Sequence, residues 1–370
     1  MRGQRAIGSR RAVFAAAALS LVYLALLRVM PGPAPAARAE MIEASRLMAR
    51  ATAALRECRA ARGIALDRAA DPNGTGLIGV EGSEITTSSG QLEAKRTTTN
   101  PDFAALVVSL LREAGVGRGD AVAVGASSSF PAFIVATLSA AAAMGVEPLV
   151  VSSLGASQWG ANVPGFMGLD MEECLRSGPF PGFAPVARAV GGEGDVGRDM
   201  EPAGRASLEA RLRAGGVPFL EEPDLARNVA RRMAIYKESA GSRRIAAFVN
   251  IGGSTANIGT NARVLELRPG LAAGIFIPPP SERGVLQAMA AAGVPVIHLL
   301  NVKGLCERYG LPWDPRPLPA PGGNGPVYRR ASSGSLPFIA LTVIYILAIV
   351  TLLGFARPAF LHLTRPGNLP

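Results

Sequence analysis

The stretch that most constrains the fold covers residues 119–153 and reads GDAVAVGASSSFPAFIVATLSAAAAMGVEPLVVSS. Residues 121–124 and 148–151 are short apolar runs that are typical of buried strands. Between them, Pro131 favours the start of a helix, because its φ is already helical and it has no N–H to lose. Gly145 is placed to end that helix. A strand, helix and strand of this length form a right-handed crossover, so the two strands are predicted to be parallel.

The same alternation continues toward the C-terminus. Further strands are predicted at residues 217–220, 245–251, 273–280 and 293–300. Helical segments lie between them, which indicates an α/β fold with a largely parallel sheet built from βαβ units. In the amphipathic helix expected at 223–240, the residues predicted to face outward are Arg227, Arg231, Arg232 and Lys237.

Both ends of the chain contain uncharged apolar runs, at residues 12–27 and 335–356. About 20 apolar residues span a bilayer, so we expect N- and C-terminal transmembrane helices flanking the α/β domain. The first is a signal anchor or a cleaved signal peptide. Arginines 2, 5, 10 and 11 would keep the N-terminus in the cytoplasm. Two spans then predict an inner-membrane protein whose main domain is extracytoplasmic.

These features predict the following organisation. Residues 1–39 hold a cytoplasmic basic end, the anchor and a short linker, and residues 40–311 form the α/β domain. A candidate Gly- and Pro-rich insertion occupies 178–204. A Pro/Gly linker at 312–334 leads to the span at 335–356 and a cytoplasmic tail at 357–370.

The net charge of +10 is concentrated at the ends of the chain. Seven of the arginines lie in residues 1–30 and 335–370, which contain no acidic residue, so the middle carries only +3. This balance does not indicate a nucleic-acid partner, which requires a dense basic face. Two histidines and three widely spaced cysteines give no metal-binding spacing, so we expect no metal and no cofactor.

Two small-residue turns, GASSSFP and NIGGSTANIG, follow predicted strands and precede helices. Such turns offer backbone N–H groups and hydroxyls to an anion, although purely structural turns have the same composition. Neither turn matches a phosphate-binding loop with its lysine. The polar run 80–99 is a candidate binding loop. The predicted ligand-binding residues are Ser127, Ser128, Ser129, Gly252, Gly253, Ser254, Asn257, Lys95 and Arg96.

A serine nucleophile is the alternative interpretation of the first turn. Ser127, Ser128 or Ser129 would use His298 as the base, since His298 is the only histidine in the predicted domain. A serine–lysine pair with Lys95 is a further option. The turn lacks the last glycine of G-x-S-x-G, and a histidine in an apolar strand is also a common core residue. We therefore assign no catalytic residue and favour a non-enzymatic role.

Long phrases of the sequence resemble the poly-gamma-glutamate system proteins, which are bacterial membrane-associated proteins found with genes for poly-gamma-glutamate capsule synthesis and export. They are residues 76–166, which begin GLIGVEGSEITTSSG and end GASQWGANVPGF, together with FVNIGGSTANIG and GVPVIHLLNVKGLCERYGLPWDP. The resemblance covers about residues 40–316 and supplies no catalytic residue.

The resemblance implies an accessory role in making, exporting or anchoring poly-gamma-glutamate at the membrane. The expected partners are the polymer or another carboxylate ligand, and the membrane synthase and export proteins. Because the chain has no phosphate-loop lysine, it does not resemble the ATP-dependent ligase of such systems. A hydrolase or transpeptidase acting on the polymer, and an anionic-solute-binding domain, remain alternatives.

Overall fold

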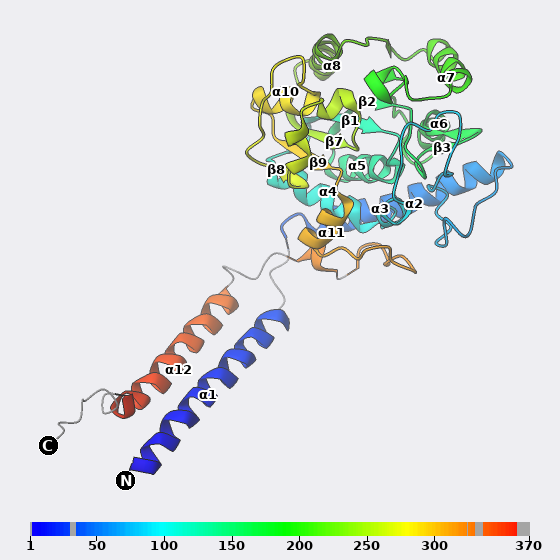
Figure 1. Cartoon of the computed structure of the whole chain (residues 1–370). Helices are drawn as coiled ribbons and strands as arrows, with labels where there is room; N and C mark the ends of the chain where they lie inside the picture. Colours follow the sequence, from blue (N-terminus) through cyan, green and yellow to red (C-terminus); the bar gives the residue numbers. More distant parts are fainter. Residues whose placement is uncertain (1, 30–34, 324, 330–335, 361–370) are drawn as a thin grey trace. The chain divides into compact units, whose positions relative to one another are not determined.

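The computed structural model describes the whole chain except residues 1, 30–34, 324, 330–335 and 361–370 (Figure 1). It contains two compact units, one from Ala36 to Tyr328 and one made of the two ends of the chain. The larger unit extends past residue 311, where the sequence had suggested that the α/β domain ends. The last part of the expected linker, 330–334, and most of the expected tail, 361–370, lie outside the described residues.

A seven-stranded sheet with the order β6-β5-β2-β1-β7-β9-β8 forms the centre of the larger unit. Its strands are β1 (Ala121–Ser127), β2 (Glu147–Ser153), β5 (Ala187–Ala189), β6 (Phe219–Leu220), β7 (Ile245–Ile251), β8 (Gly270–Ala272) and β9 (Val296–Leu299). Every pairing in this sheet is parallel except that of β8 with β9. The predicted α/β fold with a largely parallel sheet is confirmed.

The first crossover forms as its sequence predicts. Helix α5 (Pro131–Met144) starts at the proline, and Gly145 follows it in the left-handed region at φ 64°. β1 and β2 pair in parallel, from Ala121 opposite Glu147 to Ser127 opposite Ser153. The carboxyl ends of both strands therefore lie at one edge of the sheet.

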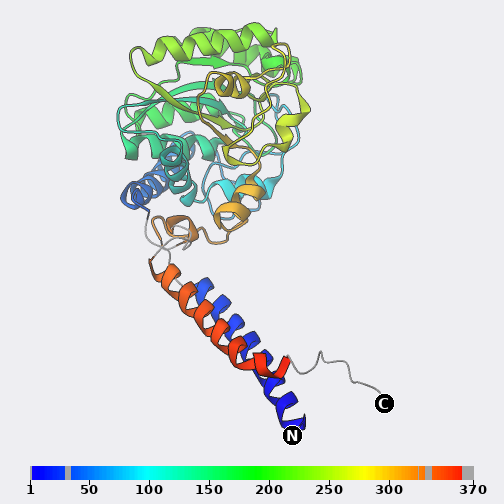
Figure 2. The same ribbon diagram turned by 90° about the vertical axis from the view of Figure 1, so that its left-hand side faces the viewer.

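Helices cover both faces of the sheet (Figures 1 and 2). On one side lie α2 (Arg38–Ala61), α4 (Asp102–Glu113) and α5, and on the other α8 (Leu225–Ala240) and α10 (Val285–Ala291). Alternate residues of β1 enter opposite cores, Val122 and Val124 on the first side and Ala121 and Ala123 on the second. Burial on both faces explains why the strands read as continuous apolar runs.

The larger unit also contains the following elements. They are α3 (Leu92–Thr98), α6 (Gly168–Ser177), α7 (Pro202–Ala214), α9 (Thr255–Ile258), α11 (Val302–Tyr309), the hairpin of β3 (Asn162–Val163) with β4 (Phe166–Met167), and three 3₁₀ turns at Glu193–Asp195, Ala262–Glu266 and Pro326–Tyr328. The expected insertion at 178–204 contributes β5, which pairs with both β2 and β6. Residues 273–280 were expected to form a strand but do not, and β8 ends just before them at Ala272.

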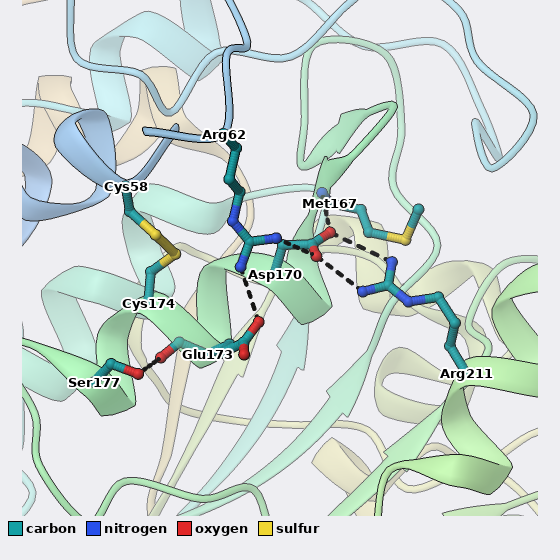
Figure 3. Close-up of a disulfide and its surroundings, with 8 residues drawn as sticks. All are labelled: Cys58, Arg62, Met167, Asp170, Glu173, Cys174, Ser177 and Arg211. Atoms are coloured by element: carbon teal, nitrogen blue, oxygen red, sulfur yellow. Dashed lines mark hydrogen bonds and ion pairs between the residues drawn. A yellow bond between two sulfur atoms is a disulfide. The ribbon is translucent and has the colours of Figure 1, made fainter. Parts of the chain in front are cut away.

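A disulfide between Cys58 of α2 and Cys174 of α6 ties these two helices together (Figure 3). Arg62 reinforces the junction through ion pairs to Asp170 at 2.7 Å and to Glu173 at 2.8 Å. Arg211 of α7 reaches the same Asp170 carboxylate at 2.9 Å. These bonds fix the start of α6, and with it the end of the loop that leaves β2.

The second unit contains α1 (Arg2–Val29) and α12 (Leu336–Phe360), which pack against each other. The rings of Tyr23 and Tyr345 stack with their centroids 4.2 Å apart. Hydrogen bonds of 2.9 Å join Ser20 to Tyr345 and Tyr23 to Thr342.

The expectation of two flanking transmembrane helices is corrected by the structure. In the part of the chain that is described, no helix combines the length and the apolar character needed to cross a membrane. The uncharged run of α1 covers only residues 12–27, whereas a span needs about 20 apolar residues. The predicted inner-membrane location with an extracytoplasmic domain was based on these spans and is withdrawn with them.

Candidate functional site

A cavity of about 550 Å³ opens at the carboxyl edge of the sheet. β1 lies at the centre of this edge, paired with β2 on one side and with β7 on the other. From β1 the chain continues to β2 on one side of the sheet, and from β7 it continues to β9 and β8 on the other side. Open α/β sheets bind ligands at such a switch point in strand order. The cavity is lined from β1, β2 and the turn after β7, and also from loops that precede and follow them.

The three serines at the end of β1 point in different directions. Ser127 and Ser129 line the cavity. Ser128 is buried and does not line the cavity, and its Oγ lies 2.3 Å from the position a Cβ on Gly168 would take. The absence of a side chain at residue 168 is therefore what admits the Ser128 hydroxyl.

The turn after β7 approaches the turn after β1 closely. Gly252 has φ +78°, and a Cβ there would lie 2.9 Å from Cβ of Ser127, so glycine is required on both counts. Gly253 and Ser254 line the cavity, and the buried Ser254 Oγ has no hydrogen-bond partner among the described residues. Asn257 lies outside the lining, fully buried against Gly125.

Lys95 of α3 is the most unusual residue of the cavity. Its side chain is 3% exposed and forms no ion pair with any described residue. The ammonium group donates to Ser157 Oγ at 2.7 Å and to the carbonyl oxygen of Ser129, and it lies 3.8 Å from the centroid of the Phe130 ring. Burial without a carboxylate partner lowers the pKa of Lys95 to about 7.

Arg96, the neighbour of Lys95 on the same helix, serves a different purpose. It forms two hydrogen bonds of 2.7 Å with the Asp314 carboxylate and does not line the cavity. The ion pair holds the segment after α11 against α3, and the adjacent Trp313 forms part of the cavity wall. Arg96 therefore positions the wall rather than the ligand.

His298 lies in the sheet and not in the cavity. It is 2% exposed on β9, and its Nδ1 is 2.9 Å from Nδ2 of Asn250 on β7. Burial lowers the pKa of His298 to about 4, so the ring is neutral. The lining contains Ser127 and Ser129 but not His298, so the structure does not assemble the serine–histidine arrangement considered from the sequence.

The polar run 80–99 reaches the cavity, as its composition had suggested. Thr87, Ser88 and Gln91 line it together with Lys95. Asn162 holds the start of this run, because its amide group donates to the Val80 carbonyl and to Thr86 Oγ1, both at 2.9 Å.

Sequence reasoning missed several residues of the lining. They are Ser157, Glu193, Asp199, Asn301, Lys303 and Trp313. Ser153, at the carboxyl end of a predicted strand, was expected at this edge and does line the cavity. The missed residues come from loops and from the start of α11, whose positions depend on distant contacts. The lining thus contains two lysines and two carboxylates, so it suits a ligand that has both anionic and N–H groups. Among the described residues, no group of three His, Cys, Asp or Glu side chains is placed to hold a metal ion.

Comparison with known proteins identifies no relative of this chain. No model of a known family matches it. No curated protein and no solved structure matches it either.

Proposed function

We propose that the cavity at the carboxyl edge of the sheet binds a ligand rich in carboxylates, and that this ligand is a short segment of poly-γ-glutamate. The protein would then act as an accessory component in the synthesis or export of that polymer. The observation that carries the proposal is the lining itself, in which hydroxyls surround a buried lysine that pairs with no carboxylate of the described residues.

The cavity has the chemistry that a carboxylate requires. A lysine without a counter-ion gains an ion pair when an anion arrives, and in a buried site such a charge-assisted hydrogen bond is stronger than at the surface. Ser254 Oγ supplies a buried hydroxyl that forms no hydrogen bond with any described residue, so ligand binding breaks none. Lys303 at the start of α11 adds a second, exposed cation at the rim.

The resemblance of residues 40–316 to the poly-gamma-glutamate system proteins supports the choice of polymer. A γ-linked chain offers a free carboxylate and an amide N–H at every residue, which suits a lining with both lysines and carboxylates. A volume of about 550 Å³ lies within the usual range of ligand pockets and suits a short segment or a chain end.

Binding of γ-linked glutamate oligomers to the full chain, measured by isothermal titration calorimetry at low salt, tests the proposal. We expect saturable binding that Lys95→Met lowers at least tenfold, since a buried charge-assisted hydrogen bond contributes about 1.5–3 kcal/mol. The matched control is Lys237→Met, because Lys237 is exposed on α8 and outside the cavity.

The affinity is also expected to fall as the pH rises through about 7, where Lys95 loses its proton. Equal affinity of the Lys95→Met and Lys237→Met proteins, or no saturable binding, would contradict the proposal. Tighter binding of α-linked than of γ-linked oligomers would contradict the choice of polymer.

A further inference from the structure

Lysine is rare in this protein, and most of its lysines line the cavity. Of the 38 Lys and Arg residues only three are lysines, and two of these, Lys95 and Lys303, line the cavity. Arginine stays protonated at any physiological pH, whereas a buried lysine can lose its proton and act as a base. A lysine at residue 95 therefore allows proton transfer that an arginine would not.

The hydroxyl of Ser157 lies in contact with this lysine. Ser157 Oγ is 2.7 Å from Lys95 Nζ, and the residue lines the cavity while being only 6% exposed. Its backbone N–H donates to Ser129 Oγ at 3.0 Å, which fixes the turn. Lys95 is held in turn by the Ser129 carbonyl and the Phe130 ring. A nucleophile within hydrogen-bond reach of an oriented base is the arrangement of covalent catalysis.

We propose that Ser157 and Lys95 form a nucleophile–base pair that makes this cavity an acyl-transfer site for γ-glutamyl amides. The substrate class rests on the proposed function, whereas the pair itself rests only on the geometry. Ser127 and Ser129 are less suited to the role, because their hydroxyls accept hydrogen bonds from the backbone N–H groups of Ser129 and Ser157, respectively.

The reaction balances without a cofactor. Neutral Lys95 takes the proton of the Ser157 hydroxyl while Oγ forms a bond to the amide carbonyl carbon. The C–N bond then breaks, and the leaving amine takes the proton from Lys95 Nζ. Water or a second amine attacks the resulting ester while Lys95 accepts its proton. Lys95 then returns this proton to Ser157 Oγ as the C–O bond breaks and the acyl group leaves. Water gives hydrolysis, and an amine gives transpeptidation.

Other charged groups near Lys95 do not replace it as the base. On α3 itself, Arg96 is paired with Asp314 and lies 3.5 Å from Glu93. The other charged residues of the lining are Lys303, Glu193 and Asp199. None of these forms a hydrogen bond with Ser157 in the described part of the chain, whereas Lys95 does.

The full chain is tested with γ-glutamyl p-nitroanilide as substrate and with a fluorophosphonate that labels activated serines. We expect p-nitroaniline release, and labelling located at Ser157 by mass spectrometry. Ser157→Ala and Lys95→Met should each lower the rate at least 10³-fold, and the double variant should be no slower than either, because the two residues act as a unit. Ser239→Ala and Lys237→Met, both on α8 outside the cavity, are the controls.

The rate at saturating substrate should rise with pH through about 7 or above, since the base must be neutral. The ligand affinity of the proposed function changes in the opposite direction, which separates the two proposals. Calorimetric binding of the polymer without labelling or turnover in the wild-type protein would overturn the nucleophile–base pair and leave the binding function standing.

Labelling at Ser157 without polymer binding would support the pair and overturn the choice of polymer. Labelling that persists in the Lys95→Met protein, or that moves to another serine in the wild type, would overturn the pair. Ser157→Ala removes only one hydroxyl and should leave the fold intact. Its rate and labelling therefore still test the pair if Lys95→Met does not fold.

Discussion

Lys95 and Arg232 are two buried cations at the same edge of the sheet, and their surroundings are opposite. Arg232 of α8 is fully buried and lies 2.6 Å from the Asp195 carboxylate, with Asn228 accepting from its Nε at 2.8 Å. Lys95 is almost as buried, but among the described residues its ammonium group interacts only with neutral oxygens and an aromatic ring. Arg232 is neutralised by a carboxylate of the protein itself, whereas Lys95 is available to pair with an anionic ligand.

The Arg232 network supports the floor of the cavity without entering it. Ser153 at the end of β2 lines the cavity, and its Oγ donates to Asp195 Oδ1 at 3.1 Å and accepts from Arg232 at 3.3 Å. This buried ion pair links α8 to the end of β2 and to the segment that contains Asp195. The comparison teaches that burial of a charge does not by itself identify a functional residue, whereas burial without a counter-ion does point to one.

Breaking the Arg232 pair should have the largest effect. Arg232→Met leaves the 2%-exposed Asp195 carboxylate without its cation, and removing one partner of a buried pair costs about 3–5 kcal/mol. Urea unfolding should show this loss in the free energy of unfolding. Adding Asp195→Asn to Arg232→Met removes the orphaned charge and should restore part of the stability. A loss below about 1 kcal/mol in the single variant would contradict the structural role given to Arg232.

The pH dependence of stability should distinguish Lys95 from Arg232. Burial lowers the Lys95 pKa from 10.5 to about 7, so between these values the unfolded chain binds more protons than the folded one. Stability from this group therefore increases as the pH rises, by about 2 kcal/mol between pH 7 and 9.

The difference between wild type and Lys95→Met isolates this contribution, because other titrating groups cancel. We expect the wild type to gain stability relative to Lys95→Met over this pH range in urea unfolding, whereas Lys237→Met should follow the wild type. A difference that stays constant between pH 7 and 9 would mean that Lys95 keeps an ordinary pKa.

The smallest expected effect concerns the unpartnered hydroxyl of Ser254. Ser254→Ala removes a buried group that makes no hydrogen bond in the described structure, so the free protein should keep its stability within about 0.5 kcal/mol. Affinity for γ-glutamate oligomers should fall roughly fivefold to tenfold, the worth of one hydrogen bond of about 1 kcal/mol. Calorimetry on matched samples measures both quantities. A drop in thermal stability with unchanged affinity would place Ser254 in the Arg232 class of structural groups.

Much of the fold could be predicted because its signals are local. Pro131 and Gly145 bound α5 in the sequence as they do in the structure, and the valine-rich runs on either side form β1 and β2. Strand ends with small polar residues mark the carboxyl edge of a parallel sheet, so Ser127 and Ser254 were placed at the cavity by chain order alone. The two expected membrane spans were wrong, since no helix in the described part of the chain is long and apolar enough to cross a bilayer.

Amphipathic patterns predicted where helices occur better than they predicted which side of a helix is buried. Arg232 was expected on the outer face of its helix beside Arg231, yet it is fully buried while Arg231 is exposed. From the sequence pattern, an arginine is predicted to be exposed to solvent. Arg232 can be buried because a carboxylate from another segment pairs with it. Asp195 comes from the segment 178–204, which had looked like an insertion and instead contributes a strand.

The sequence by itself determined the α/β class, the first crossover and the edge at which a ligand would bind, because these follow from periodicity, turn residues and chain order. Only the tertiary structure decided which polar groups meet there. In the folded protein Arg96 pairs with Asp314, and His298 is hydrogen-bonded to Asn250 within the sheet. Ser157 contacts Lys95, although 62 residues separate them in the sequence. The physical reason is that the protonation and availability of a side chain depend on its buried neighbours, and these come from segments whose positions no local pattern specifies.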